Sequence, residues 1–134
     1  MDSPEQDLLD ANAAFYACFA TGDFTRMESL WARENPVACI HPGWAAIVGR
    51  ERVLESWRRI LGFNPPKLIC AKPFACASKD GQSGFVVCEE RIGTMRLAAT
   101  NSFVREEGGF RLVNHQASPI AQEETPLPPP GTLN

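Results

Sequence analysis

Two polar side chains interrupt the apolar faces of two expected strands, and they are the first candidates for chemistry. Side chains alternate between the two faces of a strand, so Glu90 shares a face of residues 84–92 with valine, cysteine and isoleucine. Asn101 shares a face of residues 95–105 with methionine, leucine, alanine and phenylalanine. Apolar walls with a few polar groups are typical of a small-molecule site. Such walls raise the pKa of a carboxyl group, which can then serve as a general acid or base.

Both residues also have a structural interpretation. Glu90 lies between Glu89 and Arg91, and charged residues of this kind are usually solvent-exposed. In this interpretation the Glu90 side chain would also point to solvent, near the end of a strand. Asn101 would hydrogen-bond a neighbouring backbone group, as polar strand residues often do. The sequence leaves these two interpretations open.

The two histidines are the next candidates. His41 ends an apolar run and precedes a Pro-Gly turn and Trp44, and His115 lies in the last expected strand. We expect His41 to line a cavity at the rim of the sheet. Zinc would be conceivable if His41 and His115 met, but their spacing matches no metal motif and no third ligand can be named. We therefore expect no metal and no cofactor.

No motif for a nucleophile or for phosphate binding is present, since GxSxG, GxGxxG, the P-loop and HExxH are all missing. Each of the five cysteines has apolar neighbours, and no CxxC occurs. We expect reduced thiols packed in the core, no disulfide, and a cytoplasmic protein. The acidic N-terminal residues lack the basic start of a signal peptide.

Helices are expected early in the chain and strands late. The first helix is expected between the cap Ser3 and Gly22, and the third between Gly49 and Gly62. Asp23 is expected to cap a short second helix that carries Phe24, Met27 and Trp31 on its inner face. Two short strands around the Pro-Gly turn are expected over residues 37–48, and longer strands over 67–77, 84–92, 95–105 and 109–117. This order predicts an α+β fold in which residues 66–117 form one curved antiparallel sheet and helices cover one face.

The length of 134 residues and an apolar fraction of 44% suit one domain, expected over residues 1–120. Residues 121–134 are expected to be a flexible tail, because this segment holds four of the eleven prolines. A net charge of −3 argues against nucleic acid or an anionic membrane as partner, and no apolar stretch reaches the roughly 20 residues of a membrane span. Apolar side chains on both strand faces, such as Phe85 beside Val86, favour a homodimer.

Three sequence segments together resemble a known family. "IHPGW", "VGRERVLESW" and "ATNSFVREEGGFRLVNHQASP" are similar to the SnoaL-like branch of the nuclear transport factor 2-like superfamily, over about residues 5–120. The resemblance implies a cone-shaped, cystatin-like fold in which a curved antiparallel sheet wraps around three N-terminal helices. It also implies a pocket at the open end of the cone and a homodimer formed through the sheet.

The resemblance places His41, Trp44, Glu90 and Asn101 near the pocket. The candidate catalytic residues are His41 and Glu90, and the candidate substrate-binding residues are Trp44, Asn101, Phe103, Tyr16 and His115. Where relatives often have consecutive histidines, this chain has only His115, which argues against a mechanism that needs a metal or a histidine pair. The paired acidic residues of the steroid isomerases are not found at recognisable positions.

Relatives in this superfamily include isomerases, polyketide cyclases and dehydratases, and others only bind or assemble. The first hypothesis is a cofactor-independent enzyme of one of these types, in which His41 or Glu90 moves a proton and Asn101 holds an oxygen of a small apolar molecule. The second is a non-catalytic binder that uses the same pocket. The third is a dimeric accessory protein, because the fold supports many functions.

Overall fold

The computed structural model describes residues 3–121. The helices are α1 (Pro4–Thr21), α2 (Phe24–Leu30) and α3 (Arg50–Gly62). The strands are β1 (Ala38–Ile40), β2 (Ile47–Val48), β3 (Ile69–Ala77), β4 (Ser83–Ile92), β5 (Met95–Glu106) and β6 (Gly109–Pro119). The expected tail lies outside the described residues from residue 122 onward, so its flexibility stays a prediction.

Local signals in the sequence account for the helix boundaries. The Ser3 hydroxyl accepts a hydrogen bond from the Gln6 backbone N–H at 3.1 Å, which caps α1. Gly22 ends α1 in the left-handed region at φ 66°, and Asp23 then caps α2 by accepting from the Arg26 N–H at 3.0 Å. These boundaries agree with the predicted ones.

The six strands form one sheet in the order β2-β1-β6-β5-β4-β3. Neighbours from β3 to β6 are antiparallel, as predicted for residues 66–117. The sequence did not predict that β1 runs parallel to β6, with Cys39 opposite His115. Irregular registers in β3 and at Ser102/Phe103 interrupt the ladders, and such bulges bend a sheet.

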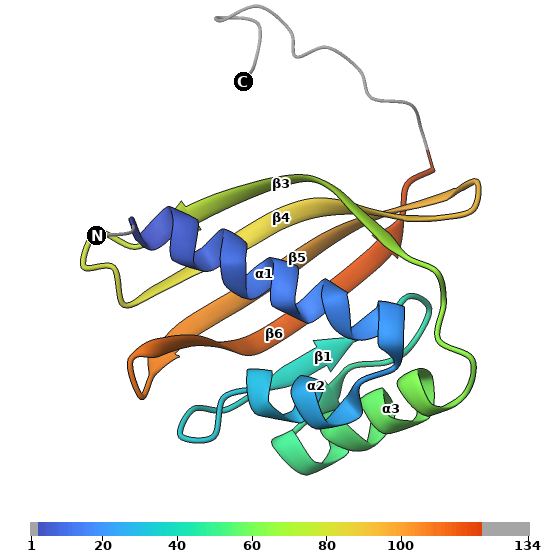
Figure 1. Cartoon of the computed structure of the whole chain (residues 1–134), viewed down its shortest axis with the longest axis horizontal. Coiled ribbons are helices and arrows are strands. Elements are labelled where there is room, and N and C mark those ends of the chain that lie inside the picture. Colours follow the sequence, from blue (N-terminus) through green and yellow to red (C-terminus); the bar gives the residue numbers. More distant parts are fainter. Residues whose placement is uncertain (1–2, 122–134) are drawn as a thin grey trace, which may run out of the picture.

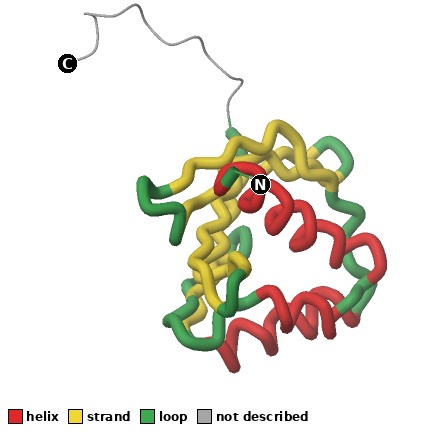
Figure 2. Tube along the Cα trace, turned by 60° about the vertical axis from the view of Figure 1, so that its left-hand side comes forward, coloured by secondary structure: helices red, strands yellow, loops and turns green. Residues whose placement is uncertain are grey.

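The sheet curves around the helices, and its inner face is turned toward them. Figure 1 shows α1 crossing this face, with α2 and α3 beside β1. Figure 2 shows the strands bending around α1, with α2 and α3 below α1 in this view. The predicted α+β fold, with a curved sheet around three N-terminal helices, is confirmed.

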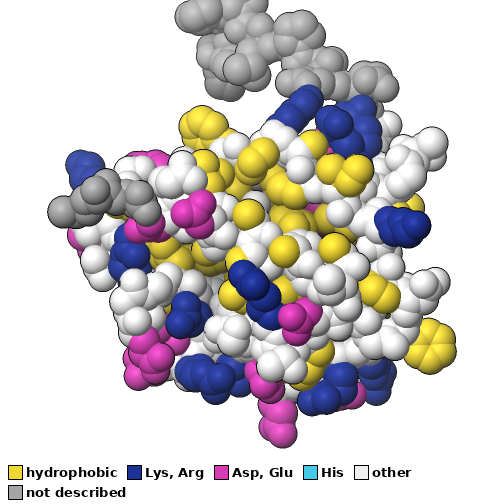
Figure 3. Space-filling view, in the orientation of Figure 1, with side chains coloured by type: hydrophobic (Ala, Val, Ile, Leu, Met, Phe, Trp, Pro, Cys, Tyr) yellow, Lys and Arg dark blue, Asp and Glu magenta, His cyan; other side chains and the backbone are white. Residues whose placement is uncertain are grey.

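Aromatic side chains fill the core between the helices and the sheet. Phe15 of α1 packs edge-on against Trp57 of α3, with ring centroids 5.4 Å apart, and both side chains are buried. On the helix-covered side, charged side chains gather along the margin formed by α2 and α3, and hydrophobic ones lie toward β3 and β4 (Figure 3). Within residues 3–121, no helix is both long enough and apolar enough to cross a membrane.

Candidate active site

A cavity of about 300 Å³ lies between the helices and the inner face of the sheet. Its walls are mostly apolar and include Phe19 of α1, Trp57 of α3 and Leu97 of β5. Three titratable side chains also line it: His41, Glu90 and His115. We call this space the inner cavity.

Glu90 is a nearly buried carboxyl group at this cavity, with 3% of its surface exposed. The Tyr16 hydroxyl donates to Glu90 Oε2 at 2.7 Å, and this bond favours the ionised form of the carboxyl. Burial is the larger influence, so the pKa of Glu90 is raised above its usual value. Burial and the nearby Glu90 also raise the pKa of Tyr16, which therefore stays protonated and keeps donating.

Asn101 organises the polar groups behind the cavity and is completely buried. Its amide Nδ2 donates to Asn12 Oδ1 at 2.8 Å and to the Tyr16 hydroxyl at 3.1 Å. Its Oδ1 lies 2.6 Å from His115 Nδ1 and, being only an acceptor, receives the proton of that nitrogen. Both hydrogens and the oxygen of the amide are thus engaged, which supports a positioning role for Asn101 rather than direct contact with a substrate oxygen.

The hydrogen bond from His115 Nδ1 to Asn101 Oδ1 fixes the tautomer of His115. Burial and the neighbouring His41 lower the pKa of His115 to about 3, so the ring is neutral at physiological pH. With the proton on Nδ1, the other nitrogen carries a free lone pair. This Nε2 lies 3.9 Å from Glu90 Oε2, beyond direct hydrogen-bond distance.

His41 is held by a different partner. The Ser56 hydroxyl donates to the Val53 carbonyl at 2.6 Å, so its oxygen accepts from His41 Nε2 at 2.9 Å. Burial lowers the pKa of His41 to about 4, and the neutral ring therefore has its free lone pair on Nδ1. Trp44 and Trp57 pack edge-on against the ring at centroid distances of 4.8 and 4.7 Å.

Cys39 lies beside His41 but does not form a nucleophilic pair with it. Its sulfur is 3.7 and 3.9 Å from the two ring nitrogens. An activated Cys–His pair needs a lowered thiol pKa. Here burial raises the pKa of Cys39 to about 12 while it lowers that of His41, so thiol and imidazole both stay neutral.

Metal binding has no support in the described part of the chain. No three His, Cys, Asp or Glu side chains come together there in a way that would hold an ion. The rings of His41 and His115 do approach each other, at a centroid distance of 6.3 Å, but the zinc hypothesis lacks a third ligand. All five cysteines are free thiols.

The residues predicted from the sequence fall into three groups. His41, Trp44, Glu90 and His115 line the inner cavity. Tyr16 and Asn101 do not line it, but they hydrogen-bond two residues that do, Glu90 and His115. Phe103 is buried in the core near Phe110, at a ring distance of 6.5 Å, and does not line the cavity, so its predicted contact with substrate has no geometric support.

The structural interpretations of Glu90 and Asn101 do not describe the fold. Glu90 faces inward rather than toward solvent, and Asn101 bonds three side chains rather than the backbone. Sequence reasoning missed Ser56 and Asn12. Each is a polar residue on the apolar side of a helix, which is the same kind of signal that pointed to Glu90.

Comparisons with known proteins agree with this architecture. A model of the SnoaL-like domain matches residues 8–122. A Streptomyces avermitilis protein described as a candidate dehydratase of the nuclear transport factor 2-like family is 29% identical, with a TM-score of 0.77 over 87% of this chain and 96% of that one. Curated protein sequences gave no match.

Two further structures are similar. A Thiobacillus denitrificans protein is 31% identical, with a TM-score of 0.71 over 82% of this chain and 92% of that one. It is described as a candidate association domain of calcium/calmodulin-dependent protein kinase type II. A candidate ketosteroid isomerase from Parabacteroides distasonis is 11% identical, with a TM-score of 0.67 over 82% of this chain and 85% of that one, and shares the fold alone. The chain therefore belongs to the SnoaL-like domain family within the nuclear transport factor 2-like superfamily.

Proposed function

We propose that this protein is a cofactor-independent acid–base enzyme, an isomerase, cyclase or dehydratase, that acts on a small apolar molecule in the inner cavity. One observation carries the proposal: Glu90 is a desolvated carboxyl group with a raised pKa that faces the free nitrogen of a neutral histidine across 3.9 Å. Perturbed carboxyl groups of this kind gather at functional sites.

The cavity offers both directions of proton transfer. In a dehydration, protonated Glu90 gives its proton to a leaving hydroxyl group. The free nitrogen of His41 or His115 takes a proton from the carbon next to a carbonyl, and the hydroxyl leaves as water. In an isomerisation, ionised Glu90 removes that carbon-bound proton and returns it to another carbon of the same molecule. The apolar walls exclude water, and Tyr16 and Asn101 hold Glu90 and His115 in place.

The test is a panel of small β-hydroxy ketones and β,γ-unsaturated ketones, both of which give a conjugated ketone that absorbs in the ultraviolet. We expect the wild-type protein to convert at least one of them and Glu90→Gln to lose the activity. The matched control is Glu89→Gln on the opposite strand face, which should retain it. Conversion that survives Glu90→Gln would contradict the proposal.

The second candidate function is non-catalytic binding in the same cavity. It is favoured if ligands bind without turnover and if Glu90→Gln and His41→Ala change affinity alone. Calorimetry with the same panel separates the two functions, because a catalytic site loses turnover in Glu90→Gln while the variant still binds.

We also propose a homodimer formed through the outer face of the sheet, and this assembly is the basis for an accessory role. The exposed apolar side chains on β3 and β4 support it: Ile69, Phe74, Phe85 and Val87. Phe74 lies directly opposite Val87, which makes the patch continuous across the two strands. Light scattering should give a dimer for the wild type and a smaller mass for Phe74→Glu, and a monomeric wild type would contradict this proposal.

The cytoplasm is the compartment that we propose. Five free cysteines, three of them buried, support a reducing environment. A thiol count on protein purified without reductant should find all five cysteines free, and loss of two thiols would contradict the assignment.

A further inference from the structure

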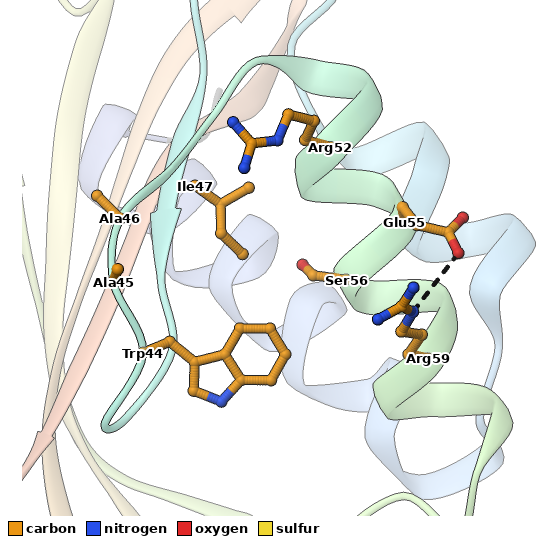
Figure 4. Close-up of a pocket in the computed structure, with 8 residues that line it drawn as sticks. All are labelled: Trp44, Ala45, Ala46, Ile47, Arg52, Glu55, Ser56 and Arg59. Carbon is orange, nitrogen blue, oxygen red and sulfur yellow. Dashed lines mark ion pairs between the residues drawn. The ribbon is translucent and has the colours of Figure 1, made fainter.

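A second cavity, of about 510 Å³, lies on the outer side of Trp44. We call it the outer cleft. It is formed between α3 and the segment that leads from the Pro-Gly turn into β2, and Figure 4 shows the Trp44 indole reaching from that segment toward α3. None of the functional roles assigned above uses this cleft.

Two arginines of α3 give the outer cleft a positive wall. Arg52 and Arg59 are seven positions apart, which places them on one face of the helix about two turns apart. Ser56 lies between them on the same face (Figure 4). Glu55 is the one acidic residue of the lining, and its carboxylate lies 3.7 Å from Arg59. The lining therefore carries one net positive charge in a chain whose overall charge is −3.

The outer cleft adjoins the inner cavity. Trp44 lines both spaces, and its side chain is about half exposed. Ser56 lines the outer cleft and accepts the hydrogen bond of His41, which lines the inner cavity. A molecule that extends past Trp44 would thus have its apolar part beside Glu90 and His41 and its other end beside the arginines.

We infer that the outer cleft binds an anionic group, a carboxylate, sulfonate or phosphate, on the molecule whose apolar part occupies the inner cavity. Arginine guanidinium groups are suited to such anions because their planar N–H groups match the oxygens in pairs. The inference rests on the proposed function, since it requires the inner cavity to accept a ligand. It narrows the substrate class to apolar molecules that carry an acid group.

The test compares two fluorescent probes with the same rings, anilinonaphthalene sulfonate and the neutral phenylnaphthylamine. We expect both to bind the full chain and the anionic probe to bind more tightly at low salt. The double variant Arg52→Gln/Arg59→Gln should weaken the anionic probe by about fivefold or more and leave the neutral probe unchanged. Added salt should likewise weaken only the anionic probe. Ile92→Trp, which replaces a lining side chain of the inner cavity by a bulkier aromatic one, should weaken both probes.

Arg58→Gln is the matched control, because Arg58 lies on the same helix and also pairs with Glu55 but does not line the outer cleft. Two results would overturn the inference while leaving the proposed function intact, provided that the neutral probe binds. In the first, the double variant weakens both probes equally. In the second, the double variant weakens the anionic probe no more than Arg58→Gln does. If Ile92→Trp leaves the neutral probe unaffected, or if that probe does not bind at all, the inner cavity itself fails as a binding site.

Discussion

Glu89 and Glu90 are adjacent on β4 and nearly equally buried, with 7% and 3% of their surfaces exposed, yet their environments are opposite. On the outer face, Glu89 accepts from Arg91 at 2.7 Å and from Arg96 at 2.8 Å, and these two cations lower its pKa. On the inner face, Glu90 receives the Tyr16 hydroxyl, and burial raises its pKa.

Low exposure alone therefore does not set the pKa of a carboxyl group: two arginines lower that of Glu89, whereas burial without a cation raises that of Glu90. A carboxylate held by two arginines stays ionised and has no proton to exchange at neutral pH. A carboxyl group in an apolar cavity is closer to the balance between its two states, which is the property that a general acid or base requires. We therefore propose a structural role for Glu89 and a catalytic role for Glu90.

Replacing each carboxyl group by the isosteric amide should give the largest difference in activity between the two positions. Glu90→Gln should lower kcat on any substrate found by about a hundredfold or more, since general acid–base groups contribute on that order. Its folded state should persist, because an amide is less costly to bury than a carboxylate. Glu89→Gln should keep kcat and lower the midpoint of thermal unfolding. Equal loss of activity in the two variants, measured under the same conditions, would remove the distinction.

The pH dependence of stability should report the neutral histidines of the inner cavity. His41 and His115 have pKa values lowered from 6.5 to about 4 and about 3, so both are neutral in the folded protein at pH 7. As the pH falls below 6.5, these histidines bind protons in the unfolded chain but not in the folded protein. The free energy of unfolding therefore falls until the pH reaches the pKa of the folded state. For His41 alone the loss amounts to at most about 3 kcal/mol.

The raised pKa of Glu90 acts in the opposite direction. Its stabilising contribution is fully present below the ordinary carboxyl value of 4.5 and is lost as the pH rises through the folded pKa. Urea unfolding between pH 4 and pH 7 should show a smaller acid loss in His41→Gln than in the wild type. An unchanged pH profile in that variant would mean that His41 is not held neutral.

Asn101→Ala tests the hydrogen bonds that support the inner face. It removes one buried hydrogen bond each from Asn12, Tyr16 and His115, so the free energy of unfolding should fall by about 2 kcal/mol or more. Ser102→Ala, on the opposite face of β5, should change it by less than about 0.5 kcal/mol. Similar losses in the two variants, measured by urea unfolding, would argue against a special role for Asn101.

Ser56→Ala is expected to have the smallest effect. Without the Ser56 oxygen the proton of His41 is no longer fixed on Nε2, so kcat should fall by about tenfold while KM changes little. Ser29→Ala is a matched control, because the Ser29 hydroxyl also donates to a carbonyl three residues earlier, at 2.7 Å, but no histidine bonds to it in the described structure. A loss of stability without a change in kcat would make Ser56 purely structural.

Local patterns were enough to predict much of this arrangement. Capping residues such as Ser3 and Asp23 predicted the helices. Strand alternation placed Glu90 and Asn101 on the same faces as apolar residues, but left open whether Glu90 points to solvent. Neither pattern contains information about pairing between distant segments. The parallel pairing of β1 with β6 puts Cys39 opposite His115 and so brings His41 near that histidine, and no local pattern indicates it.

The outer face shows the same limit of local patterns. Glu89 and Arg91 look solvent-exposed in the sequence, as charged strand residues usually are. The register of β4 and β5 places Arg91 opposite Arg96, and Glu89 is then covered by both. Burial of this carboxylate thus depends on a register between two strands, whereas its direction away from the cavity follows from alternation alone.

The most direct test of the account is a titration of both carboxyl groups in one NMR experiment, with glutamate labelled by carbon-13 at the side-chain carboxyl. Glu89→Gln and Glu90→Gln identify the two signals, and no substrate is needed. We expect Glu90 to titrate above the ordinary value of 4.5 and Glu89 below it. A Glu90 signal that titrates at or below 4.5 would contradict the assignment of Glu90 as the acid–base group of the cavity.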